Sequence, residues 1–117
     1  MSTLLATRTY AIPVQTVASG SITSSFVAAG AAMPAPIRIL KIFNTTNADI
    51  YISYDGVTEN DVLPAGVHMV LDITANKVTE DGNFLAQGTV IYIEYVSAAP
   101  TSGNVYISAY YSSNKVE

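Results

Sequence analysis

The apolar residues of this chain recur at every second position, in short runs that turn residues interrupt about every ten residues. The segment 67–73 shows the pattern most clearly, with apolar residues at Val67, Met69, Leu71 and Ile73. Successive side chains of a strand point to opposite faces, so this spacing predicts a strand with these residues on the core side. The 117 residues therefore predict one all-β domain, an antiparallel two-sheet β-sandwich of jelly-roll or immunoglobulin-like type with about seven or eight strands.

An antiparallel hairpin is predicted over residues 37–54. The segments 36–43 and 49–54 are both rich in β-branched and aromatic residues, which favour strands. The Asn-Thr-Thr-Asn sequence at 44–47 is typical of a turn, because asparagine side chains bond the local backbone and tolerate left-handed dihedral angles.

A second hairpin is predicted over residues 90–111. The segment 90–96 is the strongest strand by composition, and it is apolar on both faces except at Glu94, so we expect it to be central. A loop of about seven residues with a proline and a glycine joins it to the strand 104–111.

The first 35 residues carry a weaker pattern. Residues 10–17 suit a strand, but Pro13 lacks an N–H and confines this strand to an edge or to its own end. Residues 21–27 are a second candidate strand, and the small residues 28–35 are typical of a loop. We interpret residues 1–35 as an N-terminal arm or edge strands, and residues 36–117 as the core of the sandwich. A short helical turn near 76–87 is a further option.

The composition argues against several classes of function. Only 12% of the residues are charged, and the five basic residues are scattered, so we expect no nucleic-acid partner. The absence of cysteine excludes disulfides and thiolate metal sites. No apolar run is long enough to span a bilayer, and the first residues lack the pattern of a signal peptide, so we expect a soluble, unprocessed protein with no membrane partner.

No group of residues predicts catalysis. His68 is the one histidine, and Asp72 lies too far along the same strand face to orient it, so we interpret it as an isolated surface residue. Three carboxylates at 55–61 suit calcium, but their spacing does not match the helix–loop–helix pattern, and a solvated turn is the favoured reading. The glycosylation pattern at Asn44 is interpreted as a chance match. We expect no enzyme activity, no metal and no cofactor.

The eight tyrosines are the strongest indication of a binding surface. Tyr51, Tyr106 and Tyr110 are expected to point away from the core and are the candidate interface residues. Exposed tyrosines are typical of protein interfaces, but they also form sugar-binding surfaces, and plain strand propensity would explain them too.

The segment 38–56 and the Leu-Pro-Ala-Gly turn at 63–66 resemble small virion structural proteins of tailed bacteriophages. In those proteins a strand ending in N-x-T/N is followed by an I-x-I-S-x-D-G strand and a P-A-G turn. The resemblance covers residues 36–96. It implies a β-sandwich on a capsid or tail, where such proteins cement shell subunits, form collars at the head–tail junction or attach fibres.

The resemblance implies a capsid decoration or cement protein that binds the shell and copies of itself. Its partners would be other virion proteins (capsid, portal or tail), and it would assemble into the virion in the cytoplasm of a bacterial host. Two alternatives remain: a head–tail connector, collar or tail protein, and a carbohydrate- or receptor-binding module.

Overall fold

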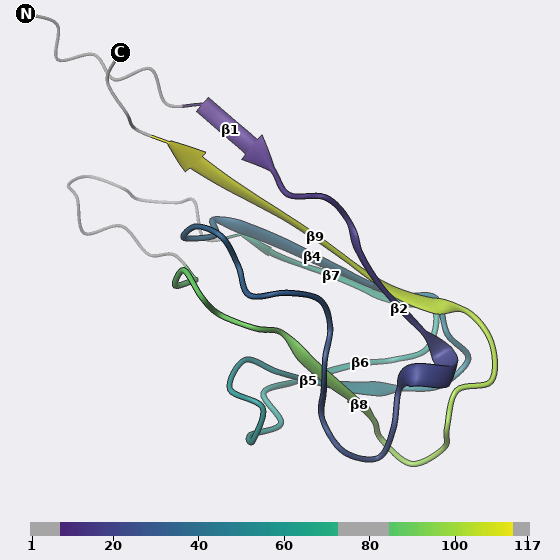
Figure 1. The fold of residues 1–117 in the computed structure, drawn as a ribbon. Helices are drawn as coiled ribbons and strands as arrows, with labels where there is room; N and C mark the ends of the chain where they lie inside the picture. Colours follow the sequence, from purple (N-terminus) through teal and green to yellow (C-terminus); the bar gives the residue numbers. More distant parts are fainter. Residues whose placement is uncertain (1–7, 73–84, 114–117) are drawn as a thin grey trace, which may run out of the picture.

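The computed structural model describes residues 8–72 and 85–113, with only the backbone described for Arg8, Thr9, Ser112 and Ser113. These residues form nine strands and one short 3-10 helix, η1 (Ser19–Ser21) (Figure 1). The strands are β1 (Arg8–Ala11), β2 (Gln15–Ala18), β3 (Val27–Ala28), β4 (Ile39–Asn44), β5 (Ile50–Ser53), β6 (Asp61–Leu63), β7 (His68–Asp72), β8 (Tyr92–Tyr95) and β9 (Asn104–Ser113).

The strands make two antiparallel sheets, which confirms the predicted all-β sandwich. Sheet A has the order β1-β9-β4-β7, and β2 pairs with the same edge of β9 as β1, farther along that strand. Sheet B has the order β3-β8-β5-β6. Strand β8 lies between β3 and β5, so the prediction of a central strand within 90–96 is confirmed.

The pairing of the strands is that of a jelly roll. The antiparallel pairs β5·β6, β4·β7, β3·β8 and β2·β9 follow one another outward from a single hairpin turn. This long folded ribbon is wrapped into two sheets, which the pairs β4·β9 and β5·β8 hold together. Such wrapping distinguishes a jelly roll from an immunoglobulin-like sandwich, and it decides between the two predicted types.

Both predicted hairpins are wrong. Strands β4 and β5 lie in different sheets, and so do β8 and β9. The segments 45–49 and 96–103 therefore cross from one sheet to the other. Packed sheets lie about 10 Å apart, a distance that three or four extended residues cover, so a short turn-rich loop suits a crossing as well as a hairpin.

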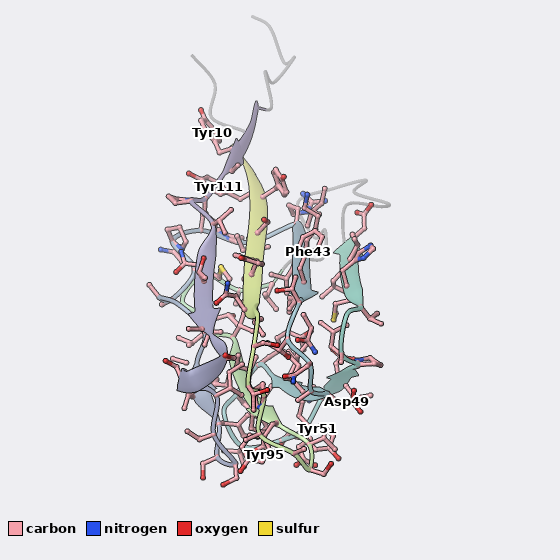
Figure 2. All side chains as sticks on the ribbon, turned by 90° about the vertical axis from the view of Figure 1, so that its right-hand side faces the viewer. Tyr10, Phe43, Asp49, Tyr51, Tyr95 and Tyr111 are labelled. Atoms are coloured by element: carbon pink, nitrogen blue, oxygen red, sulfur yellow. The ribbon has the colours of Figure 1, made fainter. Side chains whose placement is uncertain are left out.

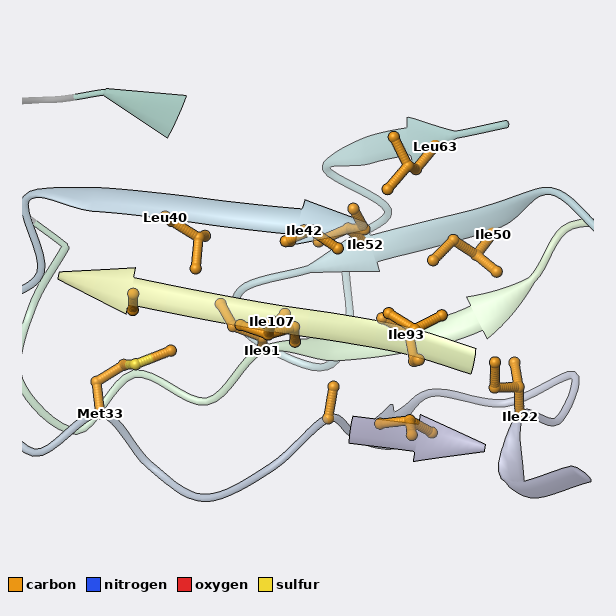
Figure 3. Packing of buried hydrophobic residues seen from close by; sticks show 14 of the residues in the cluster. Ile22, Met33, Leu40, Ile42, Ile50, Ile52, Leu63, Ile91, Ile93 and Ile107 are labelled. Atoms are coloured by element: carbon orange, nitrogen blue, oxygen red, sulfur yellow. The ribbon is translucent and has the colours of Figure 1, made fainter. Parts of the chain in front are cut away.

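Inward-facing side chains of both sheets form one hydrophobic core (Figure 3). Its fully buried large members are Ile37, Leu40, Ile42, Ile50, Ile52, Ile91, Ile93, Val105 and Ile107. In the predicted strand 67–73, Met69 and Leu71 pack against this core as expected. The inward placement of Val67 is wrong, because this residue precedes β7 in the connection from sheet B and is 43% exposed. Ile73 lies outside the described residues.

The N-terminal segment contributes to both sheets. Pro13 lies between β1 and β2, which flank it on the same edge of β9. The predicted strand 21–27 is wrong, because only Val27–Ala28 are in strand conformation. The loop that follows is held along sheet B by backbone bonds from Ala29 to Ile91 (2.7 Å) and from Met33 to Thr89 (2.9 Å). The predicted helical turn near 76–87 falls largely outside the described residues.

Candidate interaction surface

The outer face of sheet A carries half-buried aromatic and aliphatic side chains across its two central strands. On β4, the residues Ile39, Lys41 and Phe43 alternate with buried residues and so point outward. On β9, Tyr106 and Tyr110 point to the same side, because they pair directly with Phe43 and Ile39. This group, together with residues of β7, is called the A face below.

Neighbouring side chains fix the rings of the A face. The rings of Phe43 and His68 are stacked, with centroids 5.3 Å apart. The Lys41 Nζ lies 5.0 Å from the centroid of Tyr110, within the range of a cation–π contact. The hydroxyl of Tyr106 accepts a hydrogen bond of 2.9 Å from Asn104 Nδ2. His68 is therefore an exposed residue of an aromatic surface, and preorganised rings of this kind lose little conformational entropy on binding.

The outer face of sheet B, called the B face below, carries Tyr51. Val62 on β6 and Glu94 on β8 pair with Tyr51 from either side, so the three residues form one row across the sheet. Because β5 belongs to sheet B, Tyr51 lies on the opposite side of the sandwich from Tyr106 and Tyr110. In Figure 2, Tyr51 lies near the lower end of the molecule, well below Phe43 of the A face. The three predicted interface tyrosines thus belong to two separate surfaces.

Glu94 is the buried charged residue of the B face. It is 9% exposed, although it points away from the core. Burial raises the pKa of its carboxyl above the ordinary value of 4.5, and a hydrogen bond with Glu59 and the charge of that residue add to the effect. The two carboxyls therefore lie close together. They place an acidic pair beside Tyr51 in the middle of the B face.

The loop between β5 and β6 folds back over sheet B. A side chain at Gly56 would meet the ring of Tyr92, with the nearest ring carbon at 3.1 Å. The carboxylate of Asp55 accepts 2.8 Å hydrogen bonds from the backbone N–H groups of Thr58 and Val57 and from the Ser53 hydroxyl. These donors hold the pKa of Asp55 below its ordinary range.

The carboxylate of Asp61, the first residue of β6, accepts a 2.8 Å hydrogen bond from the Tyr54 hydroxyl in this loop. Burial, followed by this contact, raises the pKa of Tyr54 above its ordinary value. Two of the three carboxylates that suggested calcium thus bond groups of this loop. Among residues 8–72 and 85–113, no three potential metal ligands lie together.

Asn44 carries the glycosylation pattern, but its side chain is buried, with 1% of its surface exposed. Its Nδ2 donates to the carbonyls of Ala48 (2.9 Å), Leu63 (3.0 Å) and Pro64 (3.2 Å). Its Oδ1 accepts from the backbone N–H (3.0 Å) and the hydroxyl (2.6 Å) of Thr46. The amide nitrogen is therefore not accessible for modification, and it ties the strand end to two crossing segments.

Sequence reasoning missed Lys41, Phe43 and the pair of Glu59 and Glu94. Lys41 and Phe43 follow from the alternation with Leu40 and Ile42, which places them on the face opposite the core. The pairing of Glu94 with Glu59 has no signal in the sequence, because Glu59 comes from a loop.

Comparisons with models of protein families, with curated proteins and with solved structures found no match to this chain. Within the described ranges, no helix is long and apolar enough to cross a membrane.

Proposed function

We propose that this chain is a structural protein of a bacteriophage virion, acting as a capsid decoration or cement protein that binds the shell and further copies of itself. The observation that carries the proposal is the A face, where two central strands place Phe43 beside Tyr106 and Ile39 beside Tyr110. Aromatic residues are enriched in the centres of protein interfaces and charged residues are depleted there. The A face has this enrichment in aromatic residues.

The fold adds a second line of support. Jelly rolls are widely used in viral capsid domains, and they also occur in lectins and in small-molecule enzymes, so this support is by analogy of fold. The charged fraction of 12% is about half of the usual value, as expected for a chain whose surface is largely covered by partners.

The motif that resembles the virion proteins has a structural role in this chain. Its asparagine is Asn44, the buried residue that bonds three carbonyls. Its P-A-G turn supplies Gly66, whose N–H donates to the Asn44 carbonyl at 2.8 Å. Its S-x-D-G turn is closed by Ser53 and Asp55. The resemblance therefore concerns residues that determine the crossings of the fold, and it supports a shared architecture more than a particular partner.

The test is the presence and position of the chain in purified particles. We expect mass spectrometry to find it in multiple copies per particle, and a particle reconstruction to place the A face against the shell or a neighbouring copy. A connector, collar or tail position in that reconstruction would keep the structural role and replace decoration. The double variant Tyr106→Ala/Tyr110→Ala should be depleted from particles, whereas Val57→Ala, in a loop residue 82% exposed, should be incorporated normally.

Two results would contradict the proposal. One is the absence of the chain from particles. The other is binding of the isolated chain to a glycan array that is lost in the tyrosine variant, which would indicate a carbohydrate-binding module.

A further inference from the structure

The two outer faces carry charges of opposite sign near their centres. On the A face, Lys41 lies on a central strand in a row with Val70 on one side and Ser108 on the other. On the B face, Glu94 lies on a central strand in a row with Tyr51 and Val62. Each row ends in a valine that is exposed, with 53% of Val70 and 55% of Val62 accessible. The two rows thus share an exposed valine at one end, and they differ in the sign of the charge.

The charged residues on and around the B face are all acidic. In the described segments 50–63 and 92–95, which form the hairpin of β5 and β6 and the strand β8, every charged side chain is acidic. Of these residues, Glu94 lies on the B face, and Asp55 and Glu59 lie in the loop after β5. Asp61 pairs with the core residue Ile52 and so points to the inner side of the sheet. The A face carries charged and titratable groups of both kinds. Lys41 lies on β4, and His68 and Asp72 lie at opposite ends of β7.

These charges discriminate between the ways in which two copies can meet. An A face against another A face brings two Lys41 side chains into one interface, and a B face against another B face brings two carboxyl pairs together. Like charges placed opposite each other in an interface are costly, whereas an A face against a B face pairs opposite charges. Both faces also present half-buried aromatic rings beside the charge, which is the composition of an interface centre.

We propose that copies of this chain associate face to face, the A face of one copy packing on the B face of the next, with Lys41 directed at the Glu59–Glu94 pair. This inference rests on the proposed function, which includes self-association, and it names the two surfaces that meet. The contact is heterologous, so an open assembly keeps one free A face at one end and one free B face at the other until a ring closes.

The carboxyl pair favours this contact. The buried Glu94 carboxyl lies beside the carboxyl of the exposed Glu59, and this neighbour disfavours the ionised form of Glu94. A Lys amino group placed against them relieves this repulsion, so it gains more there than beside a single exposed carboxylate.

The test is a charge exchange in the full-length chain, followed by sedimentation velocity at low salt. Lys41→Glu makes both faces acidic, and Glu59→Lys weakens the acidic character of the B face. We expect each variant alone to self-associate at least about tenfold more weakly than the original chain. An equimolar mixture should associate again, because the intact Lys41 of the second variant faces the intact Glu59–Glu94 pair of the first.

The mixture also controls for misfolding, since a variant that fails to fold cannot be restored by mixing. Ala98→Glu and Ala98→Lys are the matched controls, because Ala98 is an exposed residue of the loop between β8 and β9 and lies on neither face. Both should self-associate like the original chain. Lys41→Gln and Glu94→Gln provide milder changes of the same two groups and should weaken association in the same direction.

A monomeric original chain at millimolar concentration and low salt would overturn the inference, as would Lys41→Glu or Glu59→Lys chains that associate normally, or a mixture that stays dissociated. These results are separate from the test of the proposed function. A chain that is present in particles but shows no charge exchange contradicts only the stacking of A on B. A chain that shows the exchange but is absent from particles contradicts only the virion role.

Discussion

Strand β9 is held in two different ways at its two ends. Where it begins, the Thr45 hydroxyl donates to the Asn104 carbonyl at 2.7 Å, and Asn47 and Thr101 exchange two bonds of 2.8 and 2.9 Å. Where it ends, residues 111–113 have β1 as their one neighbour among the described strands, because β4 begins opposite Tyr110 (Figure 1). We call the first region, formed by the loops 44–49, 63–67 and 96–103, the braced end, and the second the ribbon end.

The difference shows what crossing between sheets demands of a loop. A strand pair satisfies its own backbone groups, whereas a crossing loop leaves N–H and C=O groups that need other partners. At the braced end these partners are side chains, above all Asn44, which bonds carbonyls of both the 44–49 and the 63–67 loops. The braced end therefore helps to determine which sheet each strand enters, and the ribbon end only extends one sheet.

The largest expected effect follows from removing Asn44. Asn44→Ala removes the buried side-chain donor of the Leu63 and Pro64 carbonyls and the acceptor of the Thr46 N–H, whereas the Ala48 carbonyl keeps the Thr46 hydroxyl as a donor. Unsatisfied buried groups cost about 1–3 kcal/mol each. We expect a loss of about 4 kcal/mol in the free energy of unfolding, measured by urea denaturation. Asn47→Ala, in the same loop but exposed, should lose about 1 kcal/mol. Equal losses in the two variants would show that the buried amide does not control this end.

The next largest effect is expected at Gly103. This residue has a φ of +86°, and a Cβ there would overlap the carbonyl group of Thr45 in the neighbouring loop. Gly103→Ala should therefore destabilise the chain by about 3 kcal/mol, combining backbone strain with steric displacement of the loop. Gly66 has a similar φ of +76° but open space around it. Gly66→Ala should cost about 1 kcal/mol, the strain alone. A Gly103→Ala variant no less stable than Gly66→Ala would mean that the two loops separate easily.

The loop between β5 and β6 leaves sheet B at the end away from the braced end, and carboxyls help to hold it. Because the pKa of Glu94 is raised in the folded chain, its contribution to stability is complete below about pH 4.5 and is lost as the pH rises through the raised value. The melting temperature should thus fall between pH 4.5 and 7.5. The amide and hydroxyl bonds of the braced end do not titrate in this range, so their contribution to stability should not change with pH. Glu94→Gln should raise the melting temperature at pH 7.5 and flatten its dependence on pH.

Two details sharpen this measurement. The pKa of Asp55 is lowered, so its contribution is present above its ordinary value of 3.8 and is lost only at lower pH, which keeps the two effects apart. Glu59→Gln breaks the same carboxyl pair from the other side and should flatten the profile in the same way. A Glu94→Gln chain that melts lower than the original at pH 7.5 would contradict the raised pKa of Glu94.

The positions and faces of most strands could be predicted from the sequence, because burial on one side imposes the two-residue period directly. The alternation of Leu40 and Ile42 with Lys41 is an example. The pairing of strands could not, since the loop 45–49 has the turn chemistry of a hairpin and the length of a crossing. Only the burial of Asn44, a property of the assembled fold, distinguishes the two.

The same error in pairing affected the candidate surface. A hairpin over 37–54 would have placed Tyr51 in the sheet that contains Phe43, whereas the crossing carries it to the other side of the sandwich. The outward direction of Tyr106 and Tyr110 depended only on their own strand and was readable from its alternation with Val105 and Ile107. The two-residue period of a strand determines to which side of its sheet a side chain points. Only the order of the strands in the two sheets determines which outward residues are neighbours.

The smallest effect on overall stability is expected at the ribbon end. The rings of Tyr10 and Tyr111 are stacked there with centroids 5.3 Å apart (Figure 2). Two-stranded ribbons are marginally stable in water, so this part should open locally without unfolding the sandwich. Tyr10→Ala should lower the free energy of unfolding by less than about 1 kcal/mol. It should nevertheless speed hydrogen exchange at the Ile12 N–H, which bonds Ala109, and leave the Thr45 N–H of the braced end unchanged. If Tyr10→Ala destabilised the chain as much as Gly103→Ala, the ribbon would belong to the cooperative core, because local opening alone does not lower the stability of the whole domain.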